Sequence, residues 1–326
     1  MKRNSCGTNI LLLFLAFALS MSLTACFESD SPIPSDTPEG SPFPTEPQTP
    51  PEQITEPQPA ETEPAETEPA ETEPAETEPA ETEPEVEPEP QPFTLKIGSF
   101  NIANGEAVRH DMKYFGDDIK NAGLDIVGLQ EVDQLVPRSK KQDTVKLISE
   151  YSGLPYYAFF KAIDLNGGEY GVAILSRYPI VETFYLKLYS GTQEQRVIGG
   201  AKIDVNGTII NFFSTHLSFE SKSLRDKQYE QIASLVGDLD NFIITGDFNT
   251  ADFNEYAPIK NSDMVNNQKH SIYTFPATGP SSSIDNIVYS TGNWSFEKPS
   301  ILQNKHSDHC MLYAVGTFTP TKATEE

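Results

Sequence analysis

The stretch NFIITGDFNT, residues 241–250, decides how the fold of this chain is interpreted. An apolar run at residues 242–245 ends at Gly246, and Asp247 and Asn249 follow two residues apart. A short apolar run that stops at a glycine predicts a buried strand, whose carboxyl end would bring an acid and an amide into a cleft. Since Gly, Asp and Asn are also common in turns, a plain strand followed by a turn explains this stretch when it is considered alone.

Outward from this stretch, the same pattern occurs elsewhere in the chain. At six places an apolar run that predicts a strand ends or begins at a polar residue of the same chemical class. These polar residues are Asn101, Glu131, His216, Asp247 with Asn249, Asp285, and Asp308 with His309. Each has a plain explanation as a cap, a solvated side chain or a satisfied buried histidine, but their joint occurrence favours one active site. Oxygen ligands such as Glu131 and Asp308 suit Mg²⁺ or Mn²⁺, and a set with no thiolate and only two histidines argues against a structural zinc site.

The remaining elements predict an α/β domain. Strands are expected at residues 95–101, 125–129, 156–162, 172–175, 181–188, 196–205, 208–215, 284–289 and 311–318. Helices are expected at residues 112–122, 144–151 and 224–239. The apolar face of the last helix would consist of Leu224, Ile232, Leu235, Val236 and Leu239. Because strands outnumber helices and include an Asn206-Gly207 hairpin as well as βα units, we expect mixed sheets instead of a doubly wound parallel sheet.

The first 26 residues have the organisation of an export signal. Two basic residues precede an almost wholly apolar run at residues 10–19, which is too short for a comfortable transmembrane span. The sequence LTAC at residues 23–26 resembles a bacterial lipobox, which implies removal of residues 1–25 and lipidation of Cys26. Two acyl chains would anchor the protein stably, so we expect a membrane-anchored lipoprotein on the bacterial cell surface. An ordinary signal peptide near a cysteine, or an uncleaved anchor, would also fit.

Residues 26–92 have a strong compositional bias. They are rich in Pro, Glu and Thr, and AETEP occurs five times in succession from residue 60 to residue 84. Proline in every repeat and repulsion between like charges predict a disordered, expanded tether that begins at the lipidated cysteine. Residues 27–92 hold 20 of the 48 acids of the chain and none of its 23 Lys and Arg residues, so most of the net charge of −25 belongs to the tether.

The domain expected at residues 93–320, with a tail at residues 321–326, is only mildly acidic. Residues 93–326 carry 28 acids and 21 bases. No basic patch marks a nucleic-acid binder, and Lys140-Lys141 and Lys222 are the only hints of one near predicted loops. Cys310 is the only cysteine of this part, so we expect no intramolecular disulfide. A domain of about 225 residues is large enough to bury its own core, and we expect a monomer.

Seven short motifs in this domain resemble those of the endonuclease/exonuclease/phosphatase superfamily and occur in the same order. They are FNIANG at 100–105, LQEVD at 129–133, YGVAILSRYP at 170–179, THL at 215–217, GDFN at 246–249, IDNI at 284–287 and SDH at 307–309. The resemblance covers residues 93–318. It implies a deoxyribonuclease I-like fold, which is a four-layer α/β/β/α sandwich of two mixed, largely antiparallel sheets with the active site at one rim between them.

The resemblance also implies roles for the acids and amides. Glu131 looks like the main carboxylate ligand of a divalent metal, Mg²⁺ or Mn²⁺, with Asn101 and Asp308 close to it. Asp247 matches the acid that orients or deprotonates the attacking water, and Asn249 would help to hold it.

Two histidines are implied to act on the phosphate. His309 would contact the phosphate or transfer a proton, with the Asp285 carboxylate behind it to fix its tautomer. His216 would donate to a nonbridging oxygen. Tyr170 and Arg196 would contact the phosphate too, although Arg196 also fits a salt bridge at the rim. Whether His309 or the acid of the GDFN motif is the general base stays open.

Two positions depart from the motifs of relatives. Val172 stands where many relatives with a GEYG segment carry a polar residue, which would remove one substrate or structural contact. Asn286 stands where nucleases often have tyrosine, which would remove a nuclease-specific contact and leave the chemistry unchanged.

Together these observations predict a surface-anchored, metal-dependent phosphoesterase that hydrolyses a phosphodiester through an activated water. The substrate would be a phospholipid head group or a nucleic acid, and an extracellular endonuclease or exonuclease is the alternative within the family. The alternative outside it is a non-catalytic surface adhesin built on this fold, but a pure binding module would not need the full set of acids and imidazoles.

Overall fold

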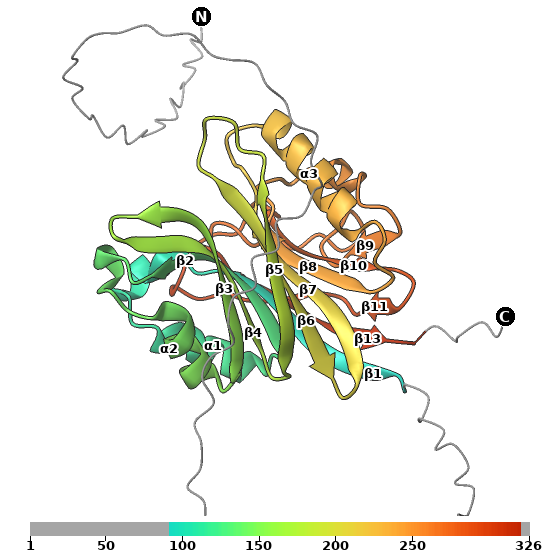
Figure 1. Cartoon of the computed structure of the whole chain (residues 1–326), viewed down its shortest axis with the longest axis horizontal. Helices are drawn as coiled ribbons and strands as arrows, with labels where there is room; N and C mark the ends of the chain where they lie inside the picture. The colour runs from blue at the N-terminus through green and yellow to red at the C-terminus, as the bar shows by residue number, and fades with distance from the viewer. Residues whose placement is uncertain (1–90, 321–326) are drawn as a thin grey trace, which may run out of the picture. The chain divides into compact units, whose positions relative to one another are not determined.

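The structure is a computed structural model in which residues 91–320 are described (Figure 1). The predicted catalytic domain at residues 93–320 falls within this part. The predicted signal peptide, Cys26, the tail at residues 321–326 and all of the tether except residues 91 and 92 lie outside the described residues. Within residues 91–320, no helix is both long enough and apolar enough to cross a membrane.

The first sheet has seven strands and is mixed. Its order is β11-β13-β1-β2-β4-β3, and β12 pairs with β13. The strands are β1 (Phe93–Asn101), β2 (Ile126–Gln134), β3 (Tyr156–Leu165), β4 (Gly168–Ser176), β11 (Trp294–Phe296), β12 (Ser300–Leu302) and β13 (Met311–Phe318). β1 and β2 run parallel, and the other neighbours run antiparallel.

The second sheet has six strands in the order β5-β6-β7-β8-β10-β9. The strands are β5 (Ile180–Leu188), β6 (Arg196–Val205), β7 (Thr208–His216), β8 (Phe242–Asp247), β9 (Ser262–Met264) and β10 (Asp285–Ser290). Only β7 and β8 run parallel among its neighbouring pairs. The sequence pattern missed β9, β11 and β12, because strands of three residues are too short to show an alternation.

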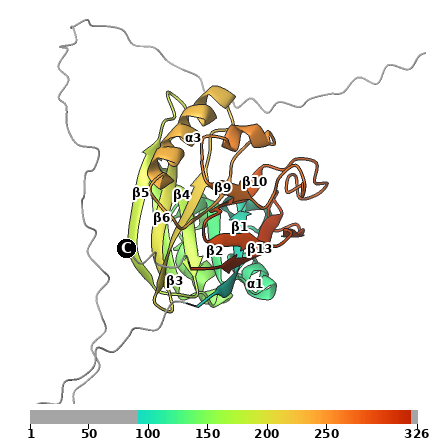
Figure 2. The ribbon, with the colours of Figure 1, turned by 90° about the vertical axis from the view of Figure 1, so that its right-hand side faces the viewer.

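Three apolar clusters show that the sheets and helices form four layers (Figures 1 and 2). One cluster, which includes Ile97 and Phe212, lies between the two sheets. A second lies on the outer face of the first sheet, where α1 (Lys113–Ala122) and α2 (Thr144–Ser152) pack. The third lies on the outer face of the second sheet beneath α3 (Lys222–Val236). The predicted α/β class, with two mixed and largely antiparallel sheets in a deoxyribonuclease I-like sandwich, is confirmed.

The predicted apolar face of α3 is wrong in its first turn. Leu224 is only half-buried, whereas Arg225 is buried, and Tyr229 in the next turn is buried in the third cluster. Arg225 donates to the two carboxylate oxygens of Glu255 at 2.8 and 3.1 Å. Hydrophobic periodicity could not reveal this contact, because the partner carboxylate lies 30 residues away in the short 3₁₀ helix η3 (Phe253–Tyr256).

The strand directions bring the polar residues to one edge of both sheets. The carboxyl ends of β1 and β2 meet because these strands are parallel, and the same holds for β7 and β8. β10 is antiparallel to β8, so its amino end lies at this edge, and Asp285 pairs with Asp247. β13 is antiparallel to β1, so the segment before it arrives at the same edge, where Leu312 pairs with Ser99.

Gly128 of β2 lies where the two sheets approach each other near this edge. A Cβ atom at this position would lie 2.0 Å from Thr245 Oγ1 and 3.0 Å from Ser214 Oγ, both on the second sheet. Neither hydroxyl is free to turn away, since Thr245 donates to Phe213 O and Ser214 donates to Leu129 O. Glycine is therefore required here for close approach.

We expect Gly128→Ala to lower the free energy of unfolding by about 1–3 kcal/mol, because the added methyl group overpacks the space between the sheets. Urea denaturation of the two proteins measures this difference. Gly279→Ala is the matched control, since its added Cβ has no neighbour within 4 Å and its φ is not in the left-handed region. A Gly128→Ala variant as stable as the control would contradict the close approach.

Candidate active site

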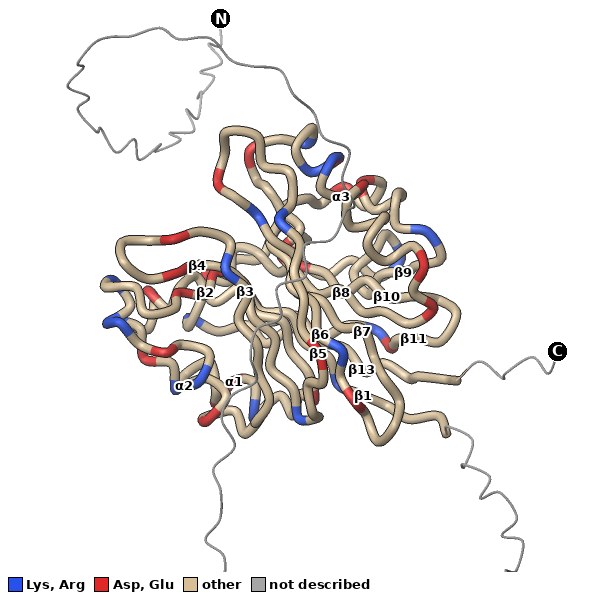
Figure 3. Tube along the Cα trace, viewed as in Figure 1, with Lys and Arg blue, Asp and Glu red and all other residues tan. Residues whose placement is uncertain are grey.

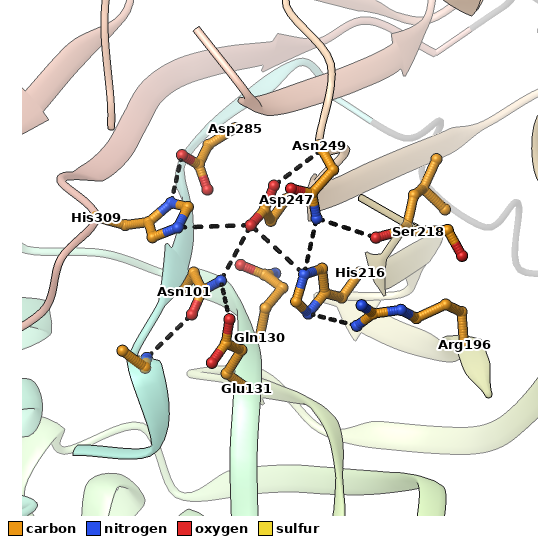
Figure 4. A network of polar contacts seen from close by, with 12 residues as sticks. Asn101, Gln130, Glu131, Arg196, His216, Ser218, Asp247, Asn249, Asp285 and His309 are labelled. Carbon is orange, nitrogen blue, oxygen red and sulfur yellow. Dashed lines mark hydrogen bonds and ion pairs between the residues drawn. The ribbon is translucent and has the colours of Figure 1, made fainter. Parts of the chain in front are cut away.

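Side chains from both sheets meet at the edge where the carboxyl ends of β1, β2, β7 and β8 lie (Figure 4). Asn101 stands at the end of β1, and its amide nitrogen donates to Glu131 Oε1 at 3.1 Å and to Asp247 Oδ2 at 3.0 Å. Its carbonyl oxygen accepts from the Ala103 N–H at 3.0 Å, at the start of the 3₁₀ helix η1 (Ala103–Val108), which fixes the orientation of the amide. One amide therefore joins an acid of the first sheet to an acid of the second.

Glu131 does not follow the end of a strand, as the sequence predicted, but lies within β2, which continues to Gln134. The pairing of β2 with β4 shifts register between Leu129 and Val132, and Glu131 has a positive φ of 55°. This is a β-bulge, which redirects a side chain that strand alternation would place otherwise. A non-glycine residue in the left-handed region costs about 1–3 kcal/mol, and such strain is concentrated at functional sites.

Asp247 occupies the centre of the site and is buried. Its Oδ1 accepts from the Asn249 N–H at 3.0 Å, and its Oδ2 lies 3.6 Å from Nε2 of His216 and 3.6 Å from Nε2 of His309. Burial, and then the charge of Asp285, raise the pKa of Asp247 to about 7, although His309 opposes the shift. A carboxyl group with this pKa can exchange a proton at neutral pH.

His309 is held by a buried carboxylate. Its Nδ1–H donates to Asp285 Oδ2 at 2.9 Å, and its ring packs against Phe275 with the centroids 4.8 Å apart. Burial opposes protonation, but the charges of Asp285, Asp247 and Asp308 outweigh it and raise the pKa of His309 to about 10. The ring is therefore protonated at neutral pH and presents its Nε2–H toward Asp247.

His216 lies between two donors. Its Nδ1 is 3.2 Å from Nη1 of Arg196, and its Nε2 is 3.0 Å from the Asn249 amide nitrogen. Burial, and then the charges of Arg196 and His309, lower the pKa of His216 well below its usual range, so the ring is neutral. A neutral imidazole has one acceptor nitrogen and arginine has only donors, so Nδ1 accepts and Nε2 carries the proton. The Asn249 amide also donates to Leu217 O at 3.0 Å, which holds its nitrogen toward the ring and leaves one donor too many.

Glu131 is the acid whose surroundings best fit a divalent cation. Burial raises the pKa of Glu131 and the nearby exposed Asp308 adds to this effect, while the hydrogen bond from Asn101 opposes it. Among residues 91–320, no Lys or Arg forms an ion pair with Glu131. Carboxylate oxygens are hard ligands of the kind that Mg²⁺ and Mn²⁺ prefer, so Glu131 and Asp308 fit such an ion. Asn101, the third predicted ligand, instead presents its amide nitrogen to Glu131, while its oxygen accepts from the Ala103 N–H.

A more compact group of possible ligands lies beside it. One ligand atom each of Asp247, Asp285 and His309 lies within 4.8 Å of the other two. Because the His309 ring is protonated and already bonded to Asp285, an ion here would have to displace a proton. Asp285 Oδ1 is buried without a hydrogen-bond partner, so this carboxylate is not fully satisfied by the imidazole. The group is better suited to proton transfer than to holding a metal.

Tyr170 and Arg196 line the side of the site formed by β4 and β6. With Glu194 and His216 they border a cavity of about 10 Å³, which is room for about one water. Arg196 forms the predicted salt bridge, at 3.0 Å to Glu194, and it contacts His216 as well, while its Nε is buried without a partner. Burial, and then the charge of Glu131, raise the pKa of Tyr170, so its hydroxyl is a donor at neutral pH.

The two residues that depart from the motifs of relatives, Val172 and Asn286, have different structural roles. Val172 is buried in the core between the sheets beside the same cavity, so packing occupies its position. Asn286 donates to Asn266 O at 2.9 Å and accepts from the Asn266 N–H at 3.1 Å. This pair holds the loop before β10 in place, which is a structural use of the amide.

Sequence reasoning missed Gln130, the neighbour of Glu131. It is buried and donates to Ser214 Oγ at 3.2 Å, which links β2 to β7 across the two sheets behind the site. A glutamine directly after an apolar run is the signal that could have revealed it, since a buried amide needs a partner. Gln130 therefore helps to fix the distance between the two halves of the site.

Other solved proteins share this fold, among them the following three. A Bacteroides thetaiotaomicron endonuclease/exonuclease/phosphatase family protein is 17% identical, with 71% of this chain and 100% of that chain covered and a TM-score of 0.58. A B. thetaiotaomicron mannosyl-6-phosphatase is 18% identical, with coverages of 68% and 98% and a TM-score of 0.54. D. rerio TDP2 complexed with a single-strand DNA product is 20% identical, with coverages of 68% and 98% and a TM-score of 0.54.

The family follows from a sequence match. The model of the Endonuclease/Exonuclease/phosphatase family matches residues 98–309, and the chain belongs to this family. No curated protein matches the chain. The resemblance recognised from the seven motifs is thus confirmed, and members of the family are phosphoesterase and nuclease hydrolases.

Asp285→Asn should lower the pKa of His309 from about 10, since Asp285 supplies the largest charge that favours the protonated ring. The folded pKa lies above the usual value of 6.5, so the stability that the pair contributes is full below pH 6.5 and is lost as pH rises through 10. The stability difference between wild type and variant should therefore shrink over this range.

Proton NMR titration of the His309 ring without added metal measures the pKa shift, and the exposed His270 in the same spectra is the internal control. Urea denaturation at several pH values measures the stability difference. A His309 titration that is unchanged in the variant would contradict the pairing.

Proposed function

We propose that this chain is a divalent-metal-dependent phosphoesterase that hydrolyses a phosphodiester by attack of an activated water. The observation that carries the proposal is the position of Asp247, which lies 3.6 Å from each of two imidazoles and is joined through Asn101 to Glu131. Asp247 has a pKa near 7, His309 is protonated, and Glu131 has no ion pair with Lys or Arg among the described residues. Groups of these kinds in one place can hydrolyse a phosphate ester.

Glu131 and Asp308 would hold the metal, and Asn101 would orient Glu131 through its amide nitrogen. When bound, the metal neutralises the charge of the phosphate and stabilises the leaving oxygen. The acids of the site itself would repel an anionic substrate, and such a cation would offset this repulsion.

The pKa values of the two acid–base candidates favour Asp247 as the general base. With a pKa of about 7, Asp247 is partly ionised at neutral pH and can accept a proton from water. His309, with a pKa of about 10, keeps its proton and donates through Nε2 to the phosphate. Asp285 holds the ring in this orientation through Nδ1.

The excess donor at His216 supports phosphate binding on the other side. Arg196 fixes the neutral ring with its proton on Nε2, and Asn249 directs a second donor at the same point. A nonbridging phosphate oxygen placed there would accept from both, which removes the conflict and stabilises the charge that builds up during the reaction.

The comparisons support the class of substrate and not its identity. Two proteins of this fold act on or contain different phosphate esters, a mannosyl-6-phosphatase and TDP2 complexed with a single-strand DNA product. A phospholipid head group agrees with the anchor predicted from the sequence, whereas an extracellular nuclease is the alternative that the second of these structures favours. Parallel assays with sphingomyelin, DNA and RNA distinguish these substrates.

Asp247→Asn and His309→Ala should each lower kcat by about 10²–10⁴-fold, because each removes one partner of the proton transfer. The measurement is steady-state hydrolysis of bis-p-nitrophenyl phosphate and of the three natural substrates with Mg²⁺ or Mn²⁺. A chelator should abolish the activity, and either cation should restore it.

Asp263→Asn is the matched control, because this exposed acid lies on β9 opposite Tyr289, at the far end of β10 from Asp285. Its activity should equal that of wild type. Full activity of His309→Ala, or wild-type turnover in the presence of chelator, would overturn the proposed function.

We also propose that Cys26 carries the lipid that anchors the protein outside the cytoplasm, on the basis of the LTAC sequence. Cys26→Ser should move the protein from the membrane fraction to the soluble fraction, as judged by detergent phase partitioning. Two acyl chains bind a bilayer stably, so the change should be nearly complete. Membrane partitioning that survives the substitution would rule out this anchor.

A further inference from the structure

Asp118 of α1 holds the segment that leads into β13. Its side chain is buried in an outer layer of the fold, where Oδ2 accepts from Asn304 Nδ2 at 2.7 Å and lies 2.7 Å from His306 Nδ1. The ring of Tyr114, one turn earlier on the same helix, packs on His306 with the centroids 4.7 Å apart. Burial of a carboxylate is costly unless it is paired, and here the partners lie 186 and 188 residues away.

The held segment continues directly into the active site. The Ser307 hydroxyl donates to Asn101 O at 2.7 Å, at the end of β1. The Ala277 N–H donates to Asp308 O at 2.6 Å, and the Cys310 N–H donates to Thr274 O at 2.7 Å. The Asp308 carboxylate is exposed, so its position depends on how the backbone around it is fixed.

We propose that Asp118 and His306 are positioning residues that fix the Asp308 carboxylate beside Glu131. The proposal deepens the proposed function and rests on it for the role of Asp308 as a metal ligand. Neither residue contacts the site. Asp118 lies on the helix α1 and His306 in the segment before β13, and they act through the backbone of residues 306–309.

Electrostatics explain why the contact between Asp118 and His306, which acts as a clamp on residues 306–309, is needed. Asp308 and Glu131 are neighbouring side chains of like charge, so they repel each other. Before a cation binds, this repulsion favours a loop conformation in which Asp308 moves away. The Asp118–His306 contact opposes that movement and keeps the ligands in place, and errors of about 1 Å in such positions are costly to catalysis.

Two variants separate the hydrogen bonds from the ring packing. His306→Phe keeps an aromatic ring against Tyr114 but cannot bond to Asp118, and Asp118→Asn keeps the size of the side chain and removes its charge. Asp117→Asn is the matched control, because it removes the same charge from α1 at an exposed ion pair with Lys113.

The first measurement is Mn²⁺ binding to the full chain by calorimetry. We expect Kd to rise about 10–100-fold in His306→Phe and in Asp118→Asn, the range typical of residues that orient metal ligands. The Kd of the double variant for Mn²⁺ should be no higher than that of the single variant with the higher Kd. The Kd of Asp117→Asn should equal that of wild type. Urea denaturation establishes that every variant is folded under the conditions of the binding experiment.

The second measurement is hydrogen exchange at the His309 and Cys310 amides without metal, which needs no activity. Both amides should exchange faster in the two clamp variants. Faster exchange with unchanged Mn²⁺ affinity would overturn the proposal, because the clamp would then be only structural, and so would unchanged exchange in both variants. If wild type binds no Mn²⁺, the proposed metal dependence fails, while faster exchange would still show that Asp118 and His306 fix the backbone of residues 306–309.

Discussion

The hydrogen bond from Asn101 to Asp247 is the contact on which the rest of the site depends. It joins side chains 146 residues apart, one from each sheet, at 3.0 Å. The sheets must lie close together for this bond to form, and Gly128, Ser214 and Gln130 are the means by which they do so. The same amide holds Glu131, so the geometry of the proposed metal ligand and that of the proposed base are not independent.

Electrostatics divide the site into two parts with different protonation. On one side, three acids keep His309 charged, and on the other, Arg196 and burial keep His216 neutral. Identical side chains on either side of Asp247 therefore differ in charge at the same pH. The charges of the domain surface are mixed, with Lys, Arg, Asp and Glu spread over the trace (Figure 3), so these local arrangements, not a general field, govern how a phosphate would be bound.

Much of this could be predicted from the sequence, and what could not has a common cause. The run at 311–318 became β13 and the run at 196–205 became β6 with their predicted limits, because short apolar runs with clear ends report on local structure. The sequence pattern did not reveal three features, which are the bulge at Glu131, the buried Arg225–Glu255 pair and the Asp118–His306 contact. Each of them depends on a partner far along the chain. The polar residues expected at strand ends do come together at one edge, whereas the distances between them required the structure.

The first and last strands of the described domain are neighbours, since β1 pairs with β13 from Phe93 opposite Phe318 to Ser99 opposite Leu312. His309 and Asp308 directly precede β13. During synthesis, the β1 edge of the first sheet therefore stays unpaired until β13 has been made. Because Asp308 and His309 come so late in the sequence, the proposed active site is incomplete until almost all of the domain has been synthesised.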